Sequence, residues 1–137
     1  MGRIKGKDTG PELFVRKELF AKGFRFRVND KRYPGTPDIV LPKYNTVVFV
    51  HGCFWHGHPN CKRAKLPDTN TEFWAAKIAK NIARDHKNIE DLRALGWQVV
   101  VVWDCELRNA AVRRNRIEAL AEEIKGGPSA RPRPAQP

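Results

Sequence analysis

Apolar residues recur along the first half of the chain in patterns that predict one helix followed by three strands. The helix is expected to begin at Thr9–Glu12, a capping-box spacing with proline in the first turn, and to end at Gly23. Residues 24–28 then alternate apolar and basic side chains, which indicates a strand with one buried face. Two short apolar strands are predicted over residues 38–41 and 45–50.

The second half of the chain begins with a long polar loop over residues 51–70. Thr69–Glu72 is a second capping-box spacing, and it predicts an amphipathic helix from about 71 to 95. The run Trp97–Trp103 is almost entirely apolar, which favours a central strand buried on both faces. A last helix is predicted over 109–125. The order αβββαβα predicts an α/β fold, a mixed sheet flanked by helices.

Composition adds a charge argument to this pattern. The 26 Lys and Arg residues outnumber the 15 Asp and Glu residues, giving a net charge of +11 and a pI near 10.0. Such an excess favours a polyanionic partner such as nucleic acid, although a generally basic, soluble surface gives the same composition. We expect a single domain over residues 1–127 and a disordered, basic, proline-rich tail over 128–137.

Several classes of protein do not fit the sequence. The longest apolar stretch, Val99–Trp103, is far below the ~20 residues that a membrane helix needs. The first residues contain no apolar segment of the kind found in secretory signals, so a cytoplasmic protein is expected. The 3 cysteines are an odd number and cannot all pair in disulfides within the chain.

The three cysteines instead suggest a metal site. Cys53 and Cys61 lie in the histidine-rich loop, and Cys105 follows the last predicted strand. Three thiolates and one loop histidine complete a closed, tetrahedral structural zinc site. Cys105 taken alone also fits a small core residue after a buried strand.

Two acidic residues near predicted element boundaries have ordinary structural interpretations. Asp38 follows the turn Tyr33–Pro37 and begins an apolar strand, where it suits a Mg²⁺ ligand or an aspartate that caps local amides. Glu12 is already explained as the glutamate of the first capping box.

The tryptophans divide into predicted core residues and candidates for binding nucleic acid. Trp97 and Trp103 bracket the apolar strand and are predicted to lie in the core. Trp55 lies beside Phe54 in the glycine- and histidine-rich loop, and Trp74 opens the long helix, so both are candidates to stack on bases. The basic residues along that helix fit an ordinary solvated face.

The motif His51-Gly-Cys-Phe-Trp-His56 resembles the very short patch repair (Vsr) endonucleases, bacterial enzymes that nick DNA at T:G mismatches. The resemblance extends over roughly residues 1–108, through Pro34–Asp38, Thr71–Ile78 and Val102–Arg108. It implies a restriction-endonuclease-like core of the PD-(D/E)XK type. The usual Glu-x-Lys of that fold is missing from the family, and Phe49-Val-His51 stands at its place.

The resemblance also implies roles for the catalytic residues. Asp38 and the backbone carbonyl of Val50 match the Mg²⁺ ligands. Glu12 and His51 match groups that act through metal-bound water. His56, oriented by Asp85, matches the group that activates the attacking water.

Further roles follow from the same resemblance. The structural zinc ligands are matched by Cys53, His58, Cys61 and Cys105, and the intercalating aromatics by Phe54, Trp55 and Trp74. Lys77, Asn81 and Arg84, on the helix of Trp74, are expected to contact DNA. The chain departs from the family where Gly57 interrupts a histidine-rich run, and its minor-groove contact is reduced to Met1 or Ile4.

The expected activity is therefore Mg²⁺-dependent nicking 5′ to the thymine of a T:G mismatch left by deamination of 5-methylcytosine. Expected partners are the mismatched duplex, MutL-like repair proteins and a cytosine DNA methyltransferase, and the enzyme is expected to act as a cytoplasmic, nucleoid-associated monomer. One alternative is a restriction- or defence-linked nickase without mismatch specificity. Another is a zinc-stabilised DNA-binding protein without catalysis.

Overall fold

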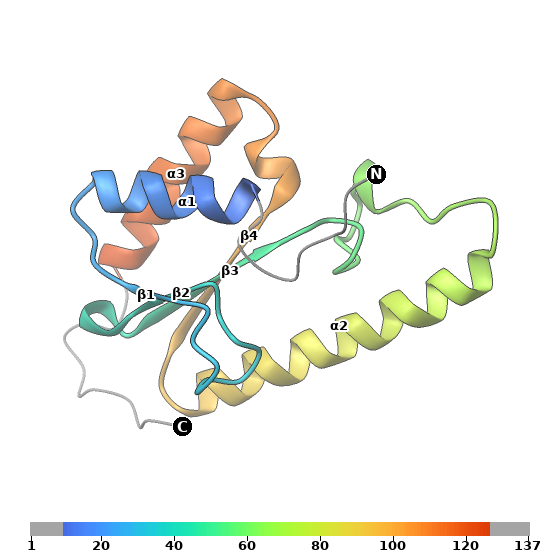
Figure 1. The fold of residues 1–137 in the computed structure, drawn as a ribbon, viewed down its shortest axis with the longest axis horizontal. Helices are drawn as coiled ribbons and strands as arrows, with labels where there is room; N and C mark the ends of the chain where they lie inside the picture. Colours follow the sequence, from blue (N-terminus) through green and yellow to red (C-terminus); the bar gives the residue numbers. More distant parts are fainter. Residues whose placement is uncertain (1–9, 127–137) are drawn as a thin grey trace.

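The computed structural model describes residues 10–126, which form a four-stranded sheet with helices on both faces (Figure 1). The elements follow in the order α1 (Gly10–Ala21), β1 (Arg27–Val28), β2 (Ile39–Leu41), β3 (Thr46–His51), α2 (Thr71–Ala94), β4 (Gln98–Trp103) and α3 (Ala110–Lys125). Short 3-10 turns occupy Pro42–Tyr44, Lys62–Ala64 and Asp104–Leu107. The predicted order αβββαβα is confirmed. Thr9, Met1, Ile4 and the expected tail over 128–137 lie outside the described residues.

The sheet is mixed, with strand order β1-β2-β3-β4. The first three strands are antiparallel neighbours, whereas β3 and β4 run parallel from Thr46 opposite Gln98 to His51 opposite Trp103. The prediction that strand 97–103 is central was wrong, because β3 is interior with all its residues buried and β4 is at the edge. Helices lie over both faces of β4, which explains its apolar composition at an edge.

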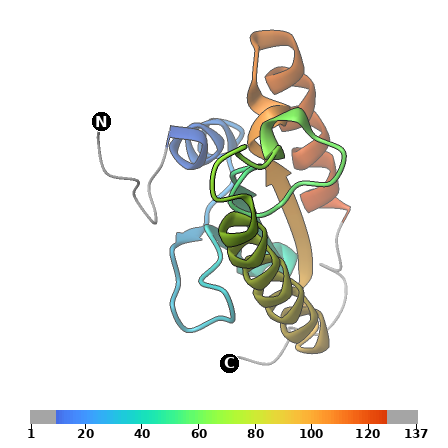
Figure 2. The same cartoon turned by 90° about the vertical axis from the view of Figure 1, so that its right-hand side faces the viewer.

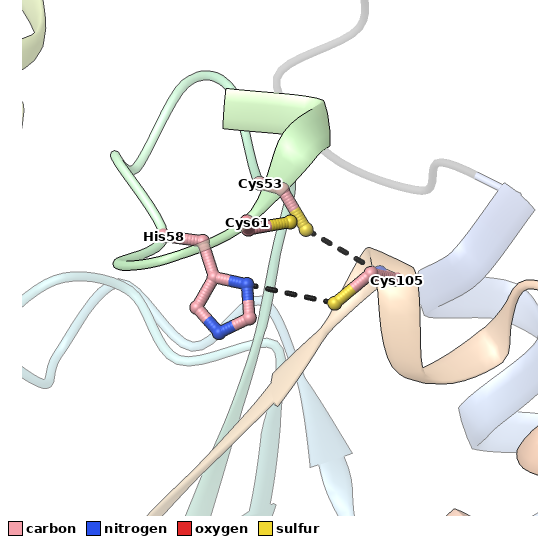
Figure 3. A group of neighbouring side chains, drawn as sticks. All are labelled: Cys53, His58, Cys61 and Cys105. Atoms are coloured by element: carbon pink, nitrogen blue, oxygen red, sulfur yellow. Dashed lines mark hydrogen bonds between the residues drawn. The ribbon is translucent and has the colours of Figure 1, made fainter. Parts of the chain in front are cut away.

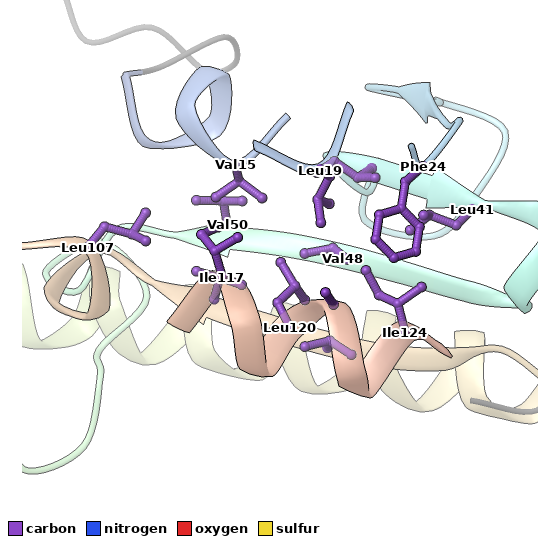
Figure 4. Packing of buried hydrophobic residues seen from close by; sticks show 14 residues of the cluster. Val15, Leu19, Phe24, Leu41, Val48, Val50, Leu107, Ile117, Leu120 and Ile124 are labelled. Atoms are coloured by element: carbon purple, nitrogen blue, oxygen red, sulfur yellow. The ribbon is translucent and has the colours of Figure 1, made fainter. Parts of the chain in front are cut away.

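The larger core lies between the sheet and the helix pair α1 and α3 (Figure 4). Alternate strand residues face these helices, because successive side chains of a strand point to opposite sides. Completely buried members of this cluster are Val15, Leu19, Ile39, Leu41, Val48, Val102, Leu120 and Ile124. Lys22, just after α1, and Glu118 of α3 form an ion pair at 2.6 Å beside it.

The opposite face of the sheet packs on the C-terminal half of α2. Val40, Val47 and Phe49 face Leu92, and Tyr33 meets Trp97 edge to face with ring centroids 5.3 Å apart. The N-terminal half of α2 extends beyond this core (Figure 1). Leu92 is buried in this core, whereas in the N-terminal half Phe73 is 61% exposed and the buried Ile78 lies under the loop at Gly57.

Two local predictions differ from the structure. The strand expected over 24–28 is reduced to Arg27–Val28, and only its first aromatic, Phe24, is buried. The Thr69–Glu72 capping box does not form, because Asn70 precedes the helix in a left-handed conformation with φ of 56° and makes no side-chain cap. The hydroxyl of Thr71 instead donates to the carbonyl of Pro67 at 2.8 Å. Among the described residues, no helix is both long and apolar enough to cross a membrane.

Candidate active site

The strand directions bring several polar side chains to one end of the sheet, the edge at which β3 and β4 finish and β2 begins. Because β3 and β4 are parallel, their last residues His51 and Trp103 lie side by side, and the antiparallel β2 begins at the same edge just after Asp38. An open cleft of about 1000 Å³ lies there. Its lining includes five of the predicted catalytic groups: Glu12, Asp38, His51, His56 and Asp85.

Asp38 is held at this edge by the neighbouring strand. The backbone N–H of Val50 donates to Oδ2 of Asp38 at 2.6 Å. Burial, together with the nearby carboxyl group of Glu12, raises the pKa of Asp38 to about 8. Glu12 is 4% exposed and forms an ion pair with Arg16 at 3.4 Å. The half-buried carboxyl group of Asp38 beside the buried one of Glu12 favours a cation between or beside them.

His56 forms the second polar group of the cleft. Its Nδ1 lies 2.6 Å from Oδ2 of Asp85, which is on the middle of α2. The ring of His51 stacks on that of His56 with centroids 3.8 Å apart. Burial, with a smaller contribution from the charge of His56, lowers the pKa of His51 to about 4, so His51 is neutral near pH 7. Nδ1 of His51 is buried without a hydrogen-bond partner among residues 10–126.

The four predicted zinc ligands form one cluster (Figure 3). Ligand atoms of Cys53, His58, Cys61 and Cys105 all lie within 4.8 Å of one another. Sγ of Cys105 is 3.5 Å from Nδ1 of His58, close to the roughly 3.5–4 Å expected between ligands of a tetrahedral zinc ion. Burial raises the pKa of the Cys53 thiol to about 12, a penalty that a bound cation removes. The cluster can hold a metal ion.

This cluster joins two distant segments of the chain. Figure 2 shows the loop that contains Cys53 and Cys61 folding over the start of α2, whereas Cys105 belongs to the turn after β4. The backbone N–H of Cys105 donates to Sγ of Cys53 at 3.3 Å. Arg63 and Asp104 add an ion pair at 2.9 Å between the same segments.

The loop between Cys53 and His58 also rests on one face of α2. Asn81 donates its side-chain amide to the backbone carbonyl of Trp55 at 2.8 Å. Gly57 has a φ of +59°, and a Cβ there would lie 2.6 Å from Cδ1 of Ile82 and 2.9 Å from Cγ2 of Ile78. A side chain at this position requires Ile82 and Ile78 to move and strains the backbone, which gives the interruption seen in the sequence a packing reason.

The aromatic residues predicted to intercalate form a half-buried group. Phe54, Trp55 and Trp74 meet edge to face, with ring centroids 5.2 to 5.7 Å apart. Trp97 is in the core as predicted, but Trp103 is only partly buried and stacks on His58 at 4.1 Å. The core prediction for Trp103 was wrong, because the residue ends its strand at the site edge.

The structure places the remaining predicted residues outside the cleft. Lys77 and Arg84 are exposed on α2, in agreement with a solvated basic face. Among the acidic and basic residues of the cleft, sequence reasoning missed two, Lys31 and Asp104. Asp104 adjoins a predicted metal ligand, which is a usable signal, whereas the position of Lys31 depends on how the loop before β2 folds.

Comparisons with known proteins confirm the resemblance. The sequence profile of the family described as DNA mismatch endonuclease Vsr matches residues 1–63. The chain is 56% identical over 125 residues to a type II nicking enzyme of Neisseria meningitidis serogroup A, covering 91% of this chain and 89% of that protein. It is 44% identical over 127 residues to the DNA mismatch endonuclease Vsr of Escherichia coli, covering 91% and 78%. A type II nicking enzyme of Xanthomonas oryzae is 44% identical over 122 residues, covering 89% of each chain.

Proposed function

Because the chain belongs to the DNA mismatch endonuclease Vsr family, we propose that it nicks one strand of duplex DNA 5′ to the thymine of a T:G mismatch. Deamination of 5-methylcytosine produces such mismatches, and the nick would begin very short patch repair. The observation that carries the proposal is the cleft at the sheet edge, where Asp38 and the paired His56 and Asp85 line one space.

Asp38 and the backbone carbonyl of Val50 are the proposed ligands of a catalytic Mg²⁺ ion. The residues fit a cation, since Asp38 is a half-buried carboxyl group beside Glu12 and its pKa is raised to about 8. The buried, unpartnered Nδ1 of His51 suits a hydrogen bond to a water on the ion. When bound, Mg²⁺ supplies Lewis-acid stabilisation of the scissile phosphate and its leaving oxygen.

His56 is the proposed general base. The carboxylate of Asp85 accepts a hydrogen bond from Nδ1, which leaves Nε2 of His56 free to take a proton from the attacking water. The stacked ring of His51 fixes the plane of His56.

The Cys53, His58, Cys61 and Cys105 cluster is proposed to bind a structural Zn²⁺. Three thiolates and one imidazole are a typical structural ligand set, closed to substrate. We also propose a restriction-endonuclease-like (PD-(D/E)XK-type) core within a single domain over 1–127.

The proposed substrate contacts come from the loop and from α2. Phe54, Trp55 and Trp74 would enter the duplex beside the mismatch, and Lys77, Asn81 and Arg84 would contact its backbone or bases. A cytosine DNA methyltransferase and MutL-like repair proteins are the proposed biological partners of a cytoplasmic, nucleoid-associated monomer.

A second candidate is a restriction-linked nickase that does not require a mismatch. It is favoured by two of the relatives, which are described as type II nicking enzymes. The same catalytic residues would serve, and only the choice of DNA differs.

One experiment separates these functions. The protein is incubated with Mg²⁺ and end-labelled duplexes that carry T:G or T:A at one position in several sequence contexts, and nicks are mapped. The proposal expects a nick 5′ to the thymine of T:G duplexes, reduced roughly 10²–10⁴-fold in His56→Ala. Equal nicking of T:A duplexes supports the restriction-linked nickase instead. Binding without any nick would leave a zinc-stabilised DNA-binding protein.

A further inference from the structure

The charges that line the cleft are unevenly divided. Four carboxyl groups face it, those of Glu12, Asp38, Asp85 and Asp104, together with Lys31. Of the cleft lining within residues 10–126, Lys31 is the one lysine or arginine. A DNA phosphate in this cleft would meet repulsion from several carboxylates, and a divalent cation at Asp38 would offset only part of it.

Lys31 has no hydrogen bond or ion pair among the described residues, although it lies between two charged neighbours. The carboxylate of Asp30 accepts instead from Arg32, from Nε at 3.0 Å, from Nη2 at 2.7 Å and from the backbone N–H at 3.1 Å. This hydrogen bonding lowers the pKa of Asp30. We propose that Lys31 is the phosphate-binding cation of the cleft and donates to a non-bridging oxygen of the scissile phosphodiester.

The loop that presents Lys31 is firmly anchored. Its two ends meet where the backbone N–H of Asn29 donates to the carbonyl of Asp38 at 3.3 Å. The side chain of Tyr33 packs on Trp97 and the residue is 3% exposed, while its backbone carbonyl accepts from the N–H of Thr36 at 3.0 Å. Because Asp38 closes the same loop, Lys31 is placed relative to the proposed metal ligand and not merely tethered to the surface.

This assignment rests on the proposed function, since it needs phosphodiester hydrolysis in the cleft. Negative charge grows on the phosphate oxygens as water attacks, so a fixed ammonium group stabilises the transition state more than the ground state. Lys31 is exposed, and solvent weakens its effect. We therefore expect a loss of about 10–100-fold, below the ~10²–10³ of a buried oxyanion donor.

The first test compares single-turnover nicking rates at saturating enzyme. Lys31→Met removes the charge but keeps the length of the chain, and Lys31→Arg keeps the charge. The matched control is Lys43→Met, since Lys43 is an exposed lysine at the opposite end of β3 from His51. Loss of about 10–100-fold in Lys31→Met, with most of the rate restored in Lys31→Arg and none lost in Lys43→Met, is expected.

The second test measures binding without metal and without cleavage. Affinity in EDTA is compared for a duplex with the natural phosphate at the mapped nick and one with a neutral methylphosphonate there. The ratio of the two affinities should fall by about 3–10-fold in Lys31→Met relative to wild type, and stay unchanged in Lys43→Met.

The outcomes separate this assignment from the proposed function. If wild type nicks DNA and Lys31→Met has the wild-type rate and the wild-type affinity ratio, the Lys31 assignment is overturned while the endonuclease remains. An equal fall in affinity for both duplexes also overturns it, because that is the behaviour of a nonspecific backbone contact. If wild type nicks no duplex, the proposed function itself has failed.

Discussion

The aliphatic core and the loop that carries the metal ligands are stabilised by different kinds of interaction. Between α1, α3 and the sheet, aliphatic side chains such as Leu19, Leu120 and Ile124 are completely buried, and stability comes from apolar area removed from water. The loop from Cys53 to Cys61 has few such contacts. The ligand cluster joins it to the turn after β4, and the Asn81 hydrogen bond, the His56–Asp85 pair and the close contact of Gly57 hold it against α2.

The difference separates stability from chemistry. The stability of the aliphatic core is distributed over many small contacts. One substitution there therefore lowers the free energy of unfolding without removing a function. The loop depends on a few irreplaceable groups, and it carries His56, Trp55 and the metal ligands together. We therefore expect variants in the two parts to affect different measurements.

Asp38→Asn should have the largest effect on nicking and almost none on the core. The amide cannot hold a cation as a carboxylate does, so we expect the single-turnover rate to fall by about 10³-fold or more. Thermal unfolding, zinc content and duplex affinity should stay close to wild type, because the side chain keeps its shape. Wild-type nicking by this variant would show that the metal ligand has been misassigned.

Cys105→Ala and Leu120→Ala form the sharpest contrast between the two parts. Cys105→Ala should lose bound zinc and hydrogen-exchange protection in the loop, and reduce nicking about 10²-fold because His56 is displaced. Leu120→Ala should lower the free energy of unfolding by about 2–5 kcal/mol but keep one zinc per chain.

Metal analysis and residue-resolved hydrogen exchange check both variants. If folded wild-type protein, prepared without chelators, carries no zinc, the structural-metal assignment is wrong. If Cys105→Ala instead exposes the amides of β3 and β4 to exchange, the loop and the core are one cooperative unit.

The helices and strands were predictable because their signal is local and periodic. The order of elements and the helix over 109–125 needed only the spacing of apolar residues and a glycine at the end. The edge position of β4 could not be predicted in this way. Its faces are covered by α2 and α3, and that cover depends on packing between elements far apart in the sequence.

The candidate site was predictable as far as residue type carried chemistry. Three cysteines and a histidine indicated the cluster that the structure brings together. Trp103 and Lys31 were missed for one reason: their positions at the site come from strand direction and loop closure, and their own sequence neighbourhoods carry no corresponding signal.

Gly57→Ala tests whether packing on α2 positions the catalytic histidine. The added methyl group would meet Ile82 and Ile78 at less than van der Waals distance, and the φ of +59° is strained for alanine. We expect nicking to fall about tenfold, since a displacement of His56 well below 1 Å is enough for that. The measurement is the single-turnover rate beside the thermal midpoint.

Gly23→Ala is the matched control on the other part of the molecule. Gly23 also has a positive φ, +96°, but nothing lies within 4 Å of its Cβ position at the end of α1. It should lose stability from backbone strain while nicking stays at the wild-type rate. Equal loss of nicking in both glycine variants would mean that general stability, and not the loop, limits the rate.

The smallest effect is expected on the choice between T:G and T:A duplexes. Trp55→Ala and Trp74→Ala should each reduce this preference by about fivefold, which corresponds to about 1 kcal/mol. Lys65→Ala should weaken binding of both duplexes about equally, because a phosphate contact carries no sequence information. Phe20→Ala is the aromatic control, since Phe20 is 56% exposed on α1 and should leave the preference unchanged.

The expected size of the T:G preference follows from two opposing free-energy contributions. Each base stacked on an aromatic ring contributes about 1–3 kcal/mol, and unstacking a base step costs a few kcal/mol, least at a mismatch. Phe54, Trp55 and Trp74 already brace one another edge to face, so little side-chain entropy is lost when they enter the duplex. Insertion is then favourable at a wobble pair and nearly balanced at a Watson–Crick pair, so the discrimination between the duplexes is only part of the stacking energy. If both tryptophan variants keep the wild-type ratio of T:G to T:A nicking, these rings pack the loop and the mismatch is read elsewhere.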